Sequence, residues 1–150
     1  MFTEVNKSIE ANKTANRRFY EEVINQKKLA VVDEVAATTY VNHGFQVGQP
    51  TGRDGLKRFV GAFHTAFADG HLTIDQMIAE GDTVATRLTF HGTHTGEFQG
   101  IAPTGKKVTM PALDMARYEG GKMVEQWGGP DQMSLLQQLG ALPSTVGSKA

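Results

Sequence analysis

The residues best suited to chemistry lie in the run EQWGGPD at positions 125–131. Asp131 follows a Gly-Gly-Pro turn, and Trp127 precedes it by four residues. If this run ends a strand at a cavity, Asp131 is the candidate general acid and base, and Trp127 is its apolar wall. An apolar wall disfavours the charged carboxylate and raises its pKa towards neutral pH, where proton abstraction next to a carbonyl is efficient. The run therefore predicts acid/base chemistry.

Both residues also have structural interpretations. Asp131 precedes a helical pattern, so its carboxylate can cap that helix by accepting backbone N–H bonds. Such bonds would lower its pKa and oppose a role as a base, unless the carboxylate still faces the cavity. Trp127 can equally be a core residue. The sequence leaves these alternatives open.

The histidines are weaker candidates. His43 lies in a Gly-rich segment, where it is either an exposed side chain or a polar partner in a pocket. His64 is expected to flank the apolar side of a helix. His91 and His94 suggest a metal site, but three residues apart on a strand they point to opposite faces and cannot chelate one ion. We therefore expect no metal.

Two other catalytic patterns fail. Residues 100–107 (GIAPTGKK) approach a phosphate-binding loop, but Lys107 occupies the position of the Mg²⁺-binding Ser or Thr, and a strand pattern follows where a helix is required. We interpret the segment as a connection that could rim a cavity. The chain also lacks a Gly-x-Ser-x-Gly motif, which argues against a serine hydrolase.

Composition narrows the class of protein. The chain has 150 residues, 39% of them hydrophobic, which suits one domain over residues 1–150 with a core at about 9–142 and a flexible tail at 143–150. The 15 basic and 16 acidic side chains nearly cancel, so the chain has no net positive charge that would attract nucleic acid or an anionic membrane. The chain lacks cysteine, and residues 1–10 are too polar for a signal peptide. We expect a cytoplasmic protein.

The periodicity predicts helices first and strands afterwards. Apolar spacing indicates helices over residues 9–26, 29–36 and 53–68, with a strand entering at 39–41 and a loop at 42–52. From residue 71 the period is two, which predicts a hairpin around 80–82 and a second one around 119–121. A final helix covers about 132–139. This order is typical of an α+β fold in which helices and a curved antiparallel sheet enclose a pocket.

Six segments, in order, resemble the SnoaL-like polyketide cyclase family. They are FYEEVIN (19–25), YVNH (40–43), GTHTGEF (92–98), GIAPTG (100–105), GKMVE (121–125) and WGGPD (127–131). The resemblance implies a cone-shaped barrel of the cystatin or nuclear transport factor 2-like type. It also implies a homodimer or higher homo-oligomer that binds an apolar, polyketide-like small molecule.

The resemblance further implies a reaction. Cyclases of this family close a ring by intramolecular aldol condensation of a polyketide ester, without metal or organic cofactor. The position of the proton-transferring aspartate matches Asp131, and His43 matches a pocket imidazole. Arg117 stands where the cyclases have a second imidazole; an arginine can hold an anion but cannot shuttle protons near neutral pH.

These residues form the predicted site: Asp131 and His43 as catalytic groups, and Trp127, Arg117, Tyr20 and Phe63 as substrate-binding groups. Two alternatives keep the fold and change the role. One is a non-catalytic protein that binds an apolar ligand, and the other is a hydratase or isomerase. Dimerisation through the sheet with a collapsed pocket is a fourth possibility.

Overall fold

The helices come first, as the apolar spacing predicts. The computed structural model describes residues 4–44 and 51–142. Helix α1 (Glu4–Arg18) runs on into a π-helical segment, η1 (Phe19–Asn25), so the first helix begins earlier than predicted and ends where expected. A short turn, η2 (Leu29–Val31), leads into α2 (Val32–Val35), and α3 (Arg53–Ala66) confirms the third predicted helix.

Five strands form one sheet in the order β1-β5-β4-β3-β2. The predicted hairpins are confirmed: β2 (His71–Glu80) pairs with β3 (Thr83–Thr93), and β4 (Lys107–Glu119) pairs with β5 (Lys122–Pro130). Strand β1 (Ala36–Asn42) departs from the antiparallel expectation, because it lies parallel to β5. No tight turn joins these two strands, so the hairpin constraint that enforces antiparallel pairing is absent between them.

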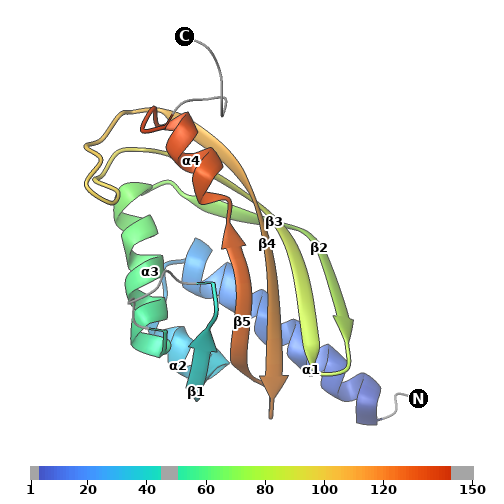
Figure 1. The fold of residues 1–150 in the computed structure, drawn as a ribbon. Coiled ribbons are helices and arrows are strands. Elements are labelled where there is room, and N and C mark those ends of the chain that lie inside the picture. Colours follow the sequence, from blue (N-terminus) through green and yellow to red (C-terminus); the bar gives the residue numbers. More distant parts are fainter. Residues whose placement is uncertain (1–3, 45–50, 143–150) are drawn as a thin grey trace.

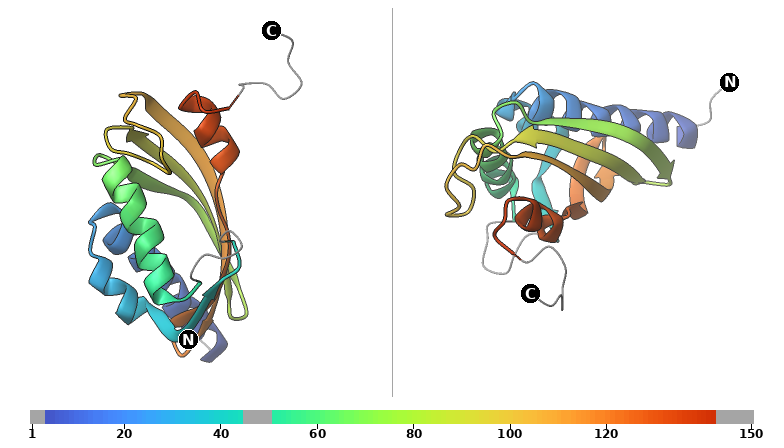
Figure 2. Two further views of the ribbon diagram at one scale, coloured as in Figure 1. Left: turned by 60° about the vertical axis from the view of Figure 1, so that its left-hand side comes forward. Right: turned by 90° about the horizontal axis from the view of Figure 1, so that it is seen from above.

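The sheet is curved, and α1, η1, α2 and α3 lie on its concave side, while α4 (Gln132–Gln138) lies at the opposite side near the end of β5 (Figures 1 and 2). Along β4 every second side chain is buried, from Val108 to Tyr118. These inward side chains meet buried residues of η1 and α3, such as Val23 and Val60, in one core. The predicted α+β cone is confirmed.

A β-bulge interrupts the pairing of β4 with β5. Arg117 pairs with Glu125, but the next residue, Tyr118, pairs with Met123, so Val124 is an extra residue in β5. A bulge reverses which face the following side chains point to. After it, Gln126 is buried on the inner side and Trp127 is exposed on the outer side.

Some expectations fall outside the described residues, namely most of the predicted loop at 42–52 and the predicted flexible tail at 143–150. Within the described part of the chain, no helix is long and apolar enough to cross a bilayer.

Candidate active site

A cavity of about 700 Å³ lies between the inner face of the sheet and the segments η1 and α3. This volume is within the range of pockets that hold small organic ligands. Its apolar wall comes from both layers and includes Phe19, Leu56, Phe59, Phe63, Leu72, Leu88, Phe90 and Met110. Such a wall suits a ligand with an extended apolar body.

Phe63 is the centre of the aromatic part of this wall. Its ring lies 5.2 Å from that of Phe59 and 5.8 Å from that of Phe90, centroid to centroid, and the Phe90 contact is edge to face. Phe67 and Phe98 extend the cluster behind it. This end of the cavity is therefore a mainly aromatic surface, built from ring pairs of preferred geometry. The predicted placement of Phe63 at the pocket agrees with this geometry.

The polar end of the cavity is built around Asp114 of β4. It occupies an inward position of the strand and is 8% exposed. Tyr20 donates a hydrogen bond from Oη to its Oδ2 at 2.7 Å, and Gln126 donates from Nε2 to the same oxygen at 3.4 Å. The other oxygen, Oδ1, is buried without a hydrogen-bond partner in the described structure. Of the described residues that line the cavity, Asp114 is the one carboxylate.

Burial changes the acidity of Asp114. The apolar surroundings raise its pKa to about 6, although the hydrogen bonds from Tyr20 and Gln126 act in the opposite direction. A carboxylate with a pKa near neutral can both take up and release a proton at physiological pH. A perturbed titratable group in a cleft is also a recognised mark of a functional site. Asp114 therefore has the acidity expected of a general acid and base.

Two backbone irregularities bring its partners to Asp114. The π-helical turn of η1 buries the neighbouring side chains Phe19 and Tyr20 together, and Tyr20 then reaches β4. The bulge at Val124 turns Gln126 inward. Both kinds of irregularity are common at functional sites, where they redirect a side chain that regular geometry would place elsewhere.

The family follows from comparison with known proteins. The model of the SnoaL-like polyketide cyclase family matches residues 14–139, a stretch that includes Tyr20, Asp114 and Gln126. The chain belongs to this family. The cavity therefore lies within a SnoaL-like fold.

Individual relatives agree. The aklanonic acid methyl ester cyclase AcmA of Streptomyces galilaeus is 34% identical over 59 residues, which span 39% of this chain and only 41% of that relative. Among solved structures, IdmH from Streptomyces antibioticus, a proposed polyketide cyclase, is 31% identical with a TM-score of 0.74, over 86% of this chain and 98% of the other. TsrD from Streptomyces laurentii shares the fold, with a TM-score of 0.80, 24% identity and coverage of 89% and 97%.

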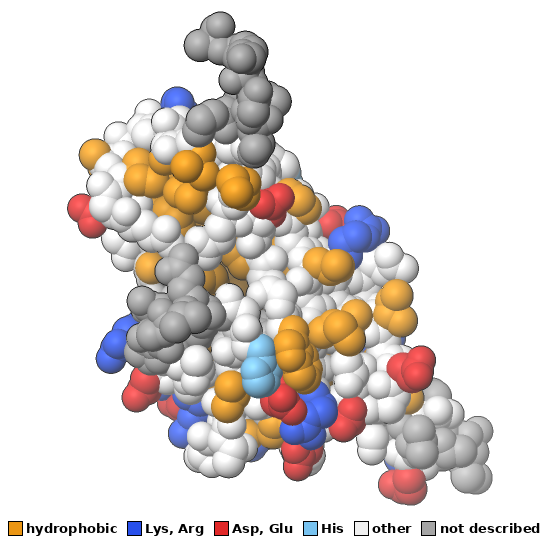
Figure 3. All heavy atoms as spheres, viewed as in Figure 1, with side chains coloured by type: hydrophobic (Ala, Val, Ile, Leu, Met, Phe, Trp, Pro, Cys, Tyr) orange, Lys and Arg blue, Asp and Glu red, His pale blue; other side chains and the backbone are white. Residues whose placement is uncertain are grey.

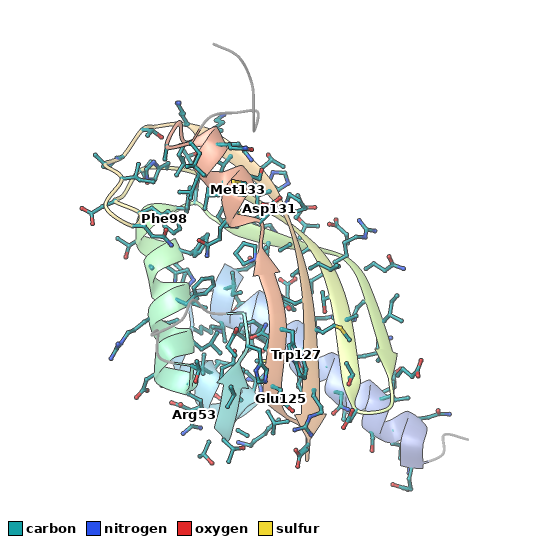
Figure 4. All side chains as sticks on the ribbon, in the orientation of Figure 1. Arg53, Phe98, Glu125, Trp127, Asp131 and Met133 are labelled. Carbon is teal, nitrogen blue, oxygen red and sulfur yellow. The ribbon has the colours of Figure 1, made fainter. Side chains whose placement is uncertain are left out.

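Asp131, the predicted acid/base in this SnoaL-like chain, lies at the start of α4 (Figure 4). It is exposed, and its Oδ1 accepts a hydrogen bond from the backbone N–H of Ser134 at 3.0 Å. It is not among the described residues that line the cavity. The geometry therefore supports the N-cap interpretation, and the proton-transfer role has no support at this position.

The other predicted residues divide into two groups. Tyr20 and Phe63 line the cavity. Trp127, His43 and Arg117 lie on the outer face of the sheet. For Trp127 the cause is the bulge, which reverses the side on which its side chain emerges. There the rings of His43 and Trp127 stack at 5.1 Å. The prediction that Trp127 forms a cavity wall is thus not supported by its position.

Glu125 joins His43 and Arg117 on this outer face. Its carboxylate lies 2.8 Å from His43 Nε2 and 2.7 Å from the Arg117 guanidinium. Hydrogen bonds with His43 and Arg117 lower the pKa of Glu125, and the bond with His43 has the larger effect. Arg117 also pairs with Glu119 at 2.7 Å. Glu125 therefore belongs to a cluster of charged groups on the surface. Because its partners favour the charged form, its pKa is too low for a general base.

His64, His91 and His94 are not among the described residues that line the cavity. His91 is exposed beside Thr109, whereas His94 is buried with Nδ1 accepting a bond from the Thr104 N–H. His64 bonds from Nε2 to the carbonyl of Ile24, which ties α3 to η1. Among the described residues, no three metal-ligating side chains gather at one point.

Asp114 was missed, although the strand pattern contains a signal for it. The inward positions of β4 are occupied by Val108, Met110, Ala112, Asp114, Ala116 and Tyr118. A carboxylate in such a series is unusual, since an isolated buried charge is costly unless it has partners or a function. Gln126 has no comparable signal, because the bulge that turns it inward depends on pairing with β4.

Proposed function

We propose that this protein catalyses the intramolecular aldol closure of a polyketide ester, with Asp114 as the acid and base. The observation that carries the proposal is a buried carboxylate of raised pKa in a largely apolar cavity, whose Oδ1 accepts no hydrogen bond from the described residues. The activity named for AcmA, a cyclase of aklanonic acid methyl ester, supports this substrate class.

The proposed reaction balances within one substrate molecule. Asp114 Oδ1 takes a proton from a carbon next to a carbonyl, and the resulting enolate carbon forms a bond to a second carbonyl carbon. The oxygen of that second carbonyl becomes an alkoxide and receives the proton from Asp114. No electrons are gained or lost and the mass is unchanged, so the ionised carboxylate is restored for another cycle.

Two cavity residues assist in this scheme. Tyr20 holds Oδ2 of Asp114 at 2.7 Å and so fixes the direction of Oδ1. Phe63 and its aromatic neighbours hold the apolar body of the substrate away from water. Excluding water protects the enolate from being reprotonated by solvent before the ring closes.

The direct test is incubation with aklanonic acid methyl ester. We expect a product of the same mass and a different retention time, detected by liquid chromatography with mass spectrometry. If the ester binds but is recovered unchanged, and acquires no deuterium next to its carbonyl in D₂O, the protein is a ligand-binding module. If the ester does not bind, the proposed substrate class is wrong.

We further propose that the protein is a homodimer that pairs through the outer face of the sheet. Ile78, Ala85, Met115 and Trp127 form one row across four strands, by the pairs Ile78–Ala85, Ala85–Met115 and Met115–Trp127. Within this row, Ile78 is 58% exposed and Met115 is 49% exposed. Figure 3 shows hydrophobic side chains spaced along this face. A largely exposed apolar row suits a two-fold interface, in which each protomer buries the same patch.

Met115→Asp is expected to convert the dimer to a monomer, because two-fold symmetry would bury the new charges at the same interface. Sedimentation equilibrium measures the change. The control is Thr73→Asp, which adds the same charge at an exposed position of β2 outside the row. A wild-type monomer, or equal dissociation of both variants, would contradict the proposed interface.

A further inference from the structure

A second layer of polar side chains determines how Gln126 meets Asp114. Gln126 Oε1 accepts a hydrogen bond from Tyr40 Oη at 2.7 Å and another from Asn42 Nδ2 at 3.3 Å. Tyr40, Asn42 and Gln126 are all buried. A primary amide can only accept at its oxygen and only donate at its nitrogen. With two donors on Oε1, the Nε2 group must be the one that faces Asp114.

The direction of these bonds begins at the backbone. The N–H of Gly44 donates to Asn42 Oδ1 at 2.7 Å, which directs the Asn42 Nδ2 group towards Tyr40 Oη at 2.9 Å and towards Gln126. A backbone N–H cannot become an acceptor, so the direction cannot reverse. Glycine is required at residue 44, because a Cβ there would lie 2.2 Å from the carbonyl oxygen of Gly128.

The result is an asymmetric carboxylate. Both donors to Asp114, Tyr20 Oη and Gln126 Nε2, reach Oδ2, while Oδ1 has none among the described residues. A carboxyl oxygen that already accepts two hydrogen bonds is a poorer site for a proton than one that accepts none. Oδ1 is therefore the favoured site for the proton when Asp114 is neutral.

We propose that Tyr40 is a positioning residue that, through Gln126, keeps Oδ2 of Asp114 occupied and reserves Oδ1 for the catalytic proton. This inference rests on the proposed function of Asp114. Tyr40 is absent from the described lining of the cavity, so it acts through Gln126 and does not touch the substrate.

Of Asp114 and the buried tyrosines around it, Asp114 is the group that titrates near neutral pH. Burial raises the pKa of Tyr20, Tyr40 and Tyr118 above the ordinary value for a phenol, so all three are neutral. Arg58 is the other charged residue of the described cavity lining, and it is exposed. A change in the titration of Asp114 therefore reports on its hydrogen bonds.

The test is Tyr40→Phe, which removes one hydroxyl and keeps the ring. With one of the two donors to Oε1 lost, the Gln126 amide is held less firmly and donates less to Asp114. We expect the pKa of Asp114, followed by carboxyl NMR, to rise by about half a unit to one unit, which is the range for one neutral hydrogen bond. The side-chain amide protons of Gln126 should exchange with solvent at least about tenfold faster.

Tyr118→Phe is the matched control. Tyr118 is equally buried and donates from Oη to Asn16 Oδ1 at 2.7 Å, and Asn16 in turn bonds to Thr86. It has no direct bond to Asp114 or to Gln126 in the described structure, so the pKa of Asp114 should move by less than about a third of a unit. Equal shifts in the two variants would mean a general loosening of the core and would overturn the proposal.

A third variant covers the case in which Tyr40→Phe does not fold. Gln126→Met keeps the length of the side chain and removes the donor, and it should raise the pKa of Asp114 by about one unit. An unchanged pKa in Gln126→Met, or an unchanged pKa and amide exchange in folded Tyr40→Phe, would refute the positioning role. These NMR results do not depend on turnover, so they remain decisive even if the proposed reaction is wrong.

Discussion

Asp114→Asn is expected to lower the turnover of aklanonic acid methyl ester by about 10²- to 10⁴-fold, the range for losing a general acid and base. Asparagine keeps the size of the side chain and can still accept the hydrogen bond from Tyr20. It cannot take up the proton that Asp114 Oδ1 is proposed to abstract. Ligand affinity should change only a few-fold. Steady-state kinetics and a binding titration separate the two effects.

Asp131→Asn is the control for this experiment. Asparagine is as good an N-cap as aspartate and can keep the bond from the Ser134 N–H, so α4 should stay intact. Turnover should then remain within about twofold of the wild type, because nothing at Asp131 reaches the described cavity lining. The opposite pattern, with activity lost in Asp131→Asn and retained in Asp114→Asn, would return the catalytic role to Asp131.

The second large effect concerns stability. Asp114→Asn is expected to stabilise the protein above pH 6 by up to about 3 kcal/mol, since burial raises the pKa of Asp114 from 3.8 to about 6 and each unit corresponds to about 1.4 kcal/mol. Between these pH values the folded chain holds a proton that the unfolded chain has released. The wild type therefore loses stability from Asp114 as the pH rises from about 4 to 6.

Urea unfolding of both proteins between pH 3.5 and 8 measures this effect. The difference between them isolates Asp114, because Glu22, Asp33, Asp69 and Glu125 have lowered pKa values and contribute the opposite slope in both. The difference should be small below pH 4, grow up to about pH 6 and then level off. A difference that does not vary with pH would show that Asp114 titrates as an ordinary carboxyl group.

A gain in stability together with a loss of activity has a physical basis. The cavity charge is unfavourable for folding because it is removed from water, and the same desolvation brings its pKa near neutral. Buried, partly satisfied polar groups of this kind are commonly kept for function at the expense of stability. Asp114→Asn and Asp131→Asn therefore distinguish a catalytic role of Asp114 from a catalytic role of Asp131.

The sequence predicted the elements better than the site. The period of two from residue 71 onwards predicted the hairpin that contains β4, and Tyr20 and Phe63, predicted as substrate-binding groups, line the cavity. The same alternation contains Asp114 at an inward position, whereas the family motif placed the acid/base at Asp131. The motif identifies the family, and it does not determine which carboxylate faces the cavity.

Two features of the site depend on long-range pairing and could not be predicted from local patterns. The bulge at Val124 arises where β5 pairs with β4, and it exchanges the expected sides of Gln126 and Trp127. The parallel pairing of β1 with β5 brings Tyr40 and Asn42 to Gln126, more than 80 residues away in the chain. By contrast, the N-cap role of Asp131 is local, and the helical pattern that follows Asp131 in the sequence indicates it.

The most direct test of the account is the pKa of Asp114 in the wild-type protein, measured by ¹³C carboxyl NMR with Asp114→Asn for assignment. We expect a midpoint of about 6, because a desolvated carboxylate exchanges its proton nearer neutral pH. A midpoint below about 4 would mean an ordinary, fully solvated or fully paired carboxylate. That result would contradict the proposal that Asp114 is the acid and base of this cavity.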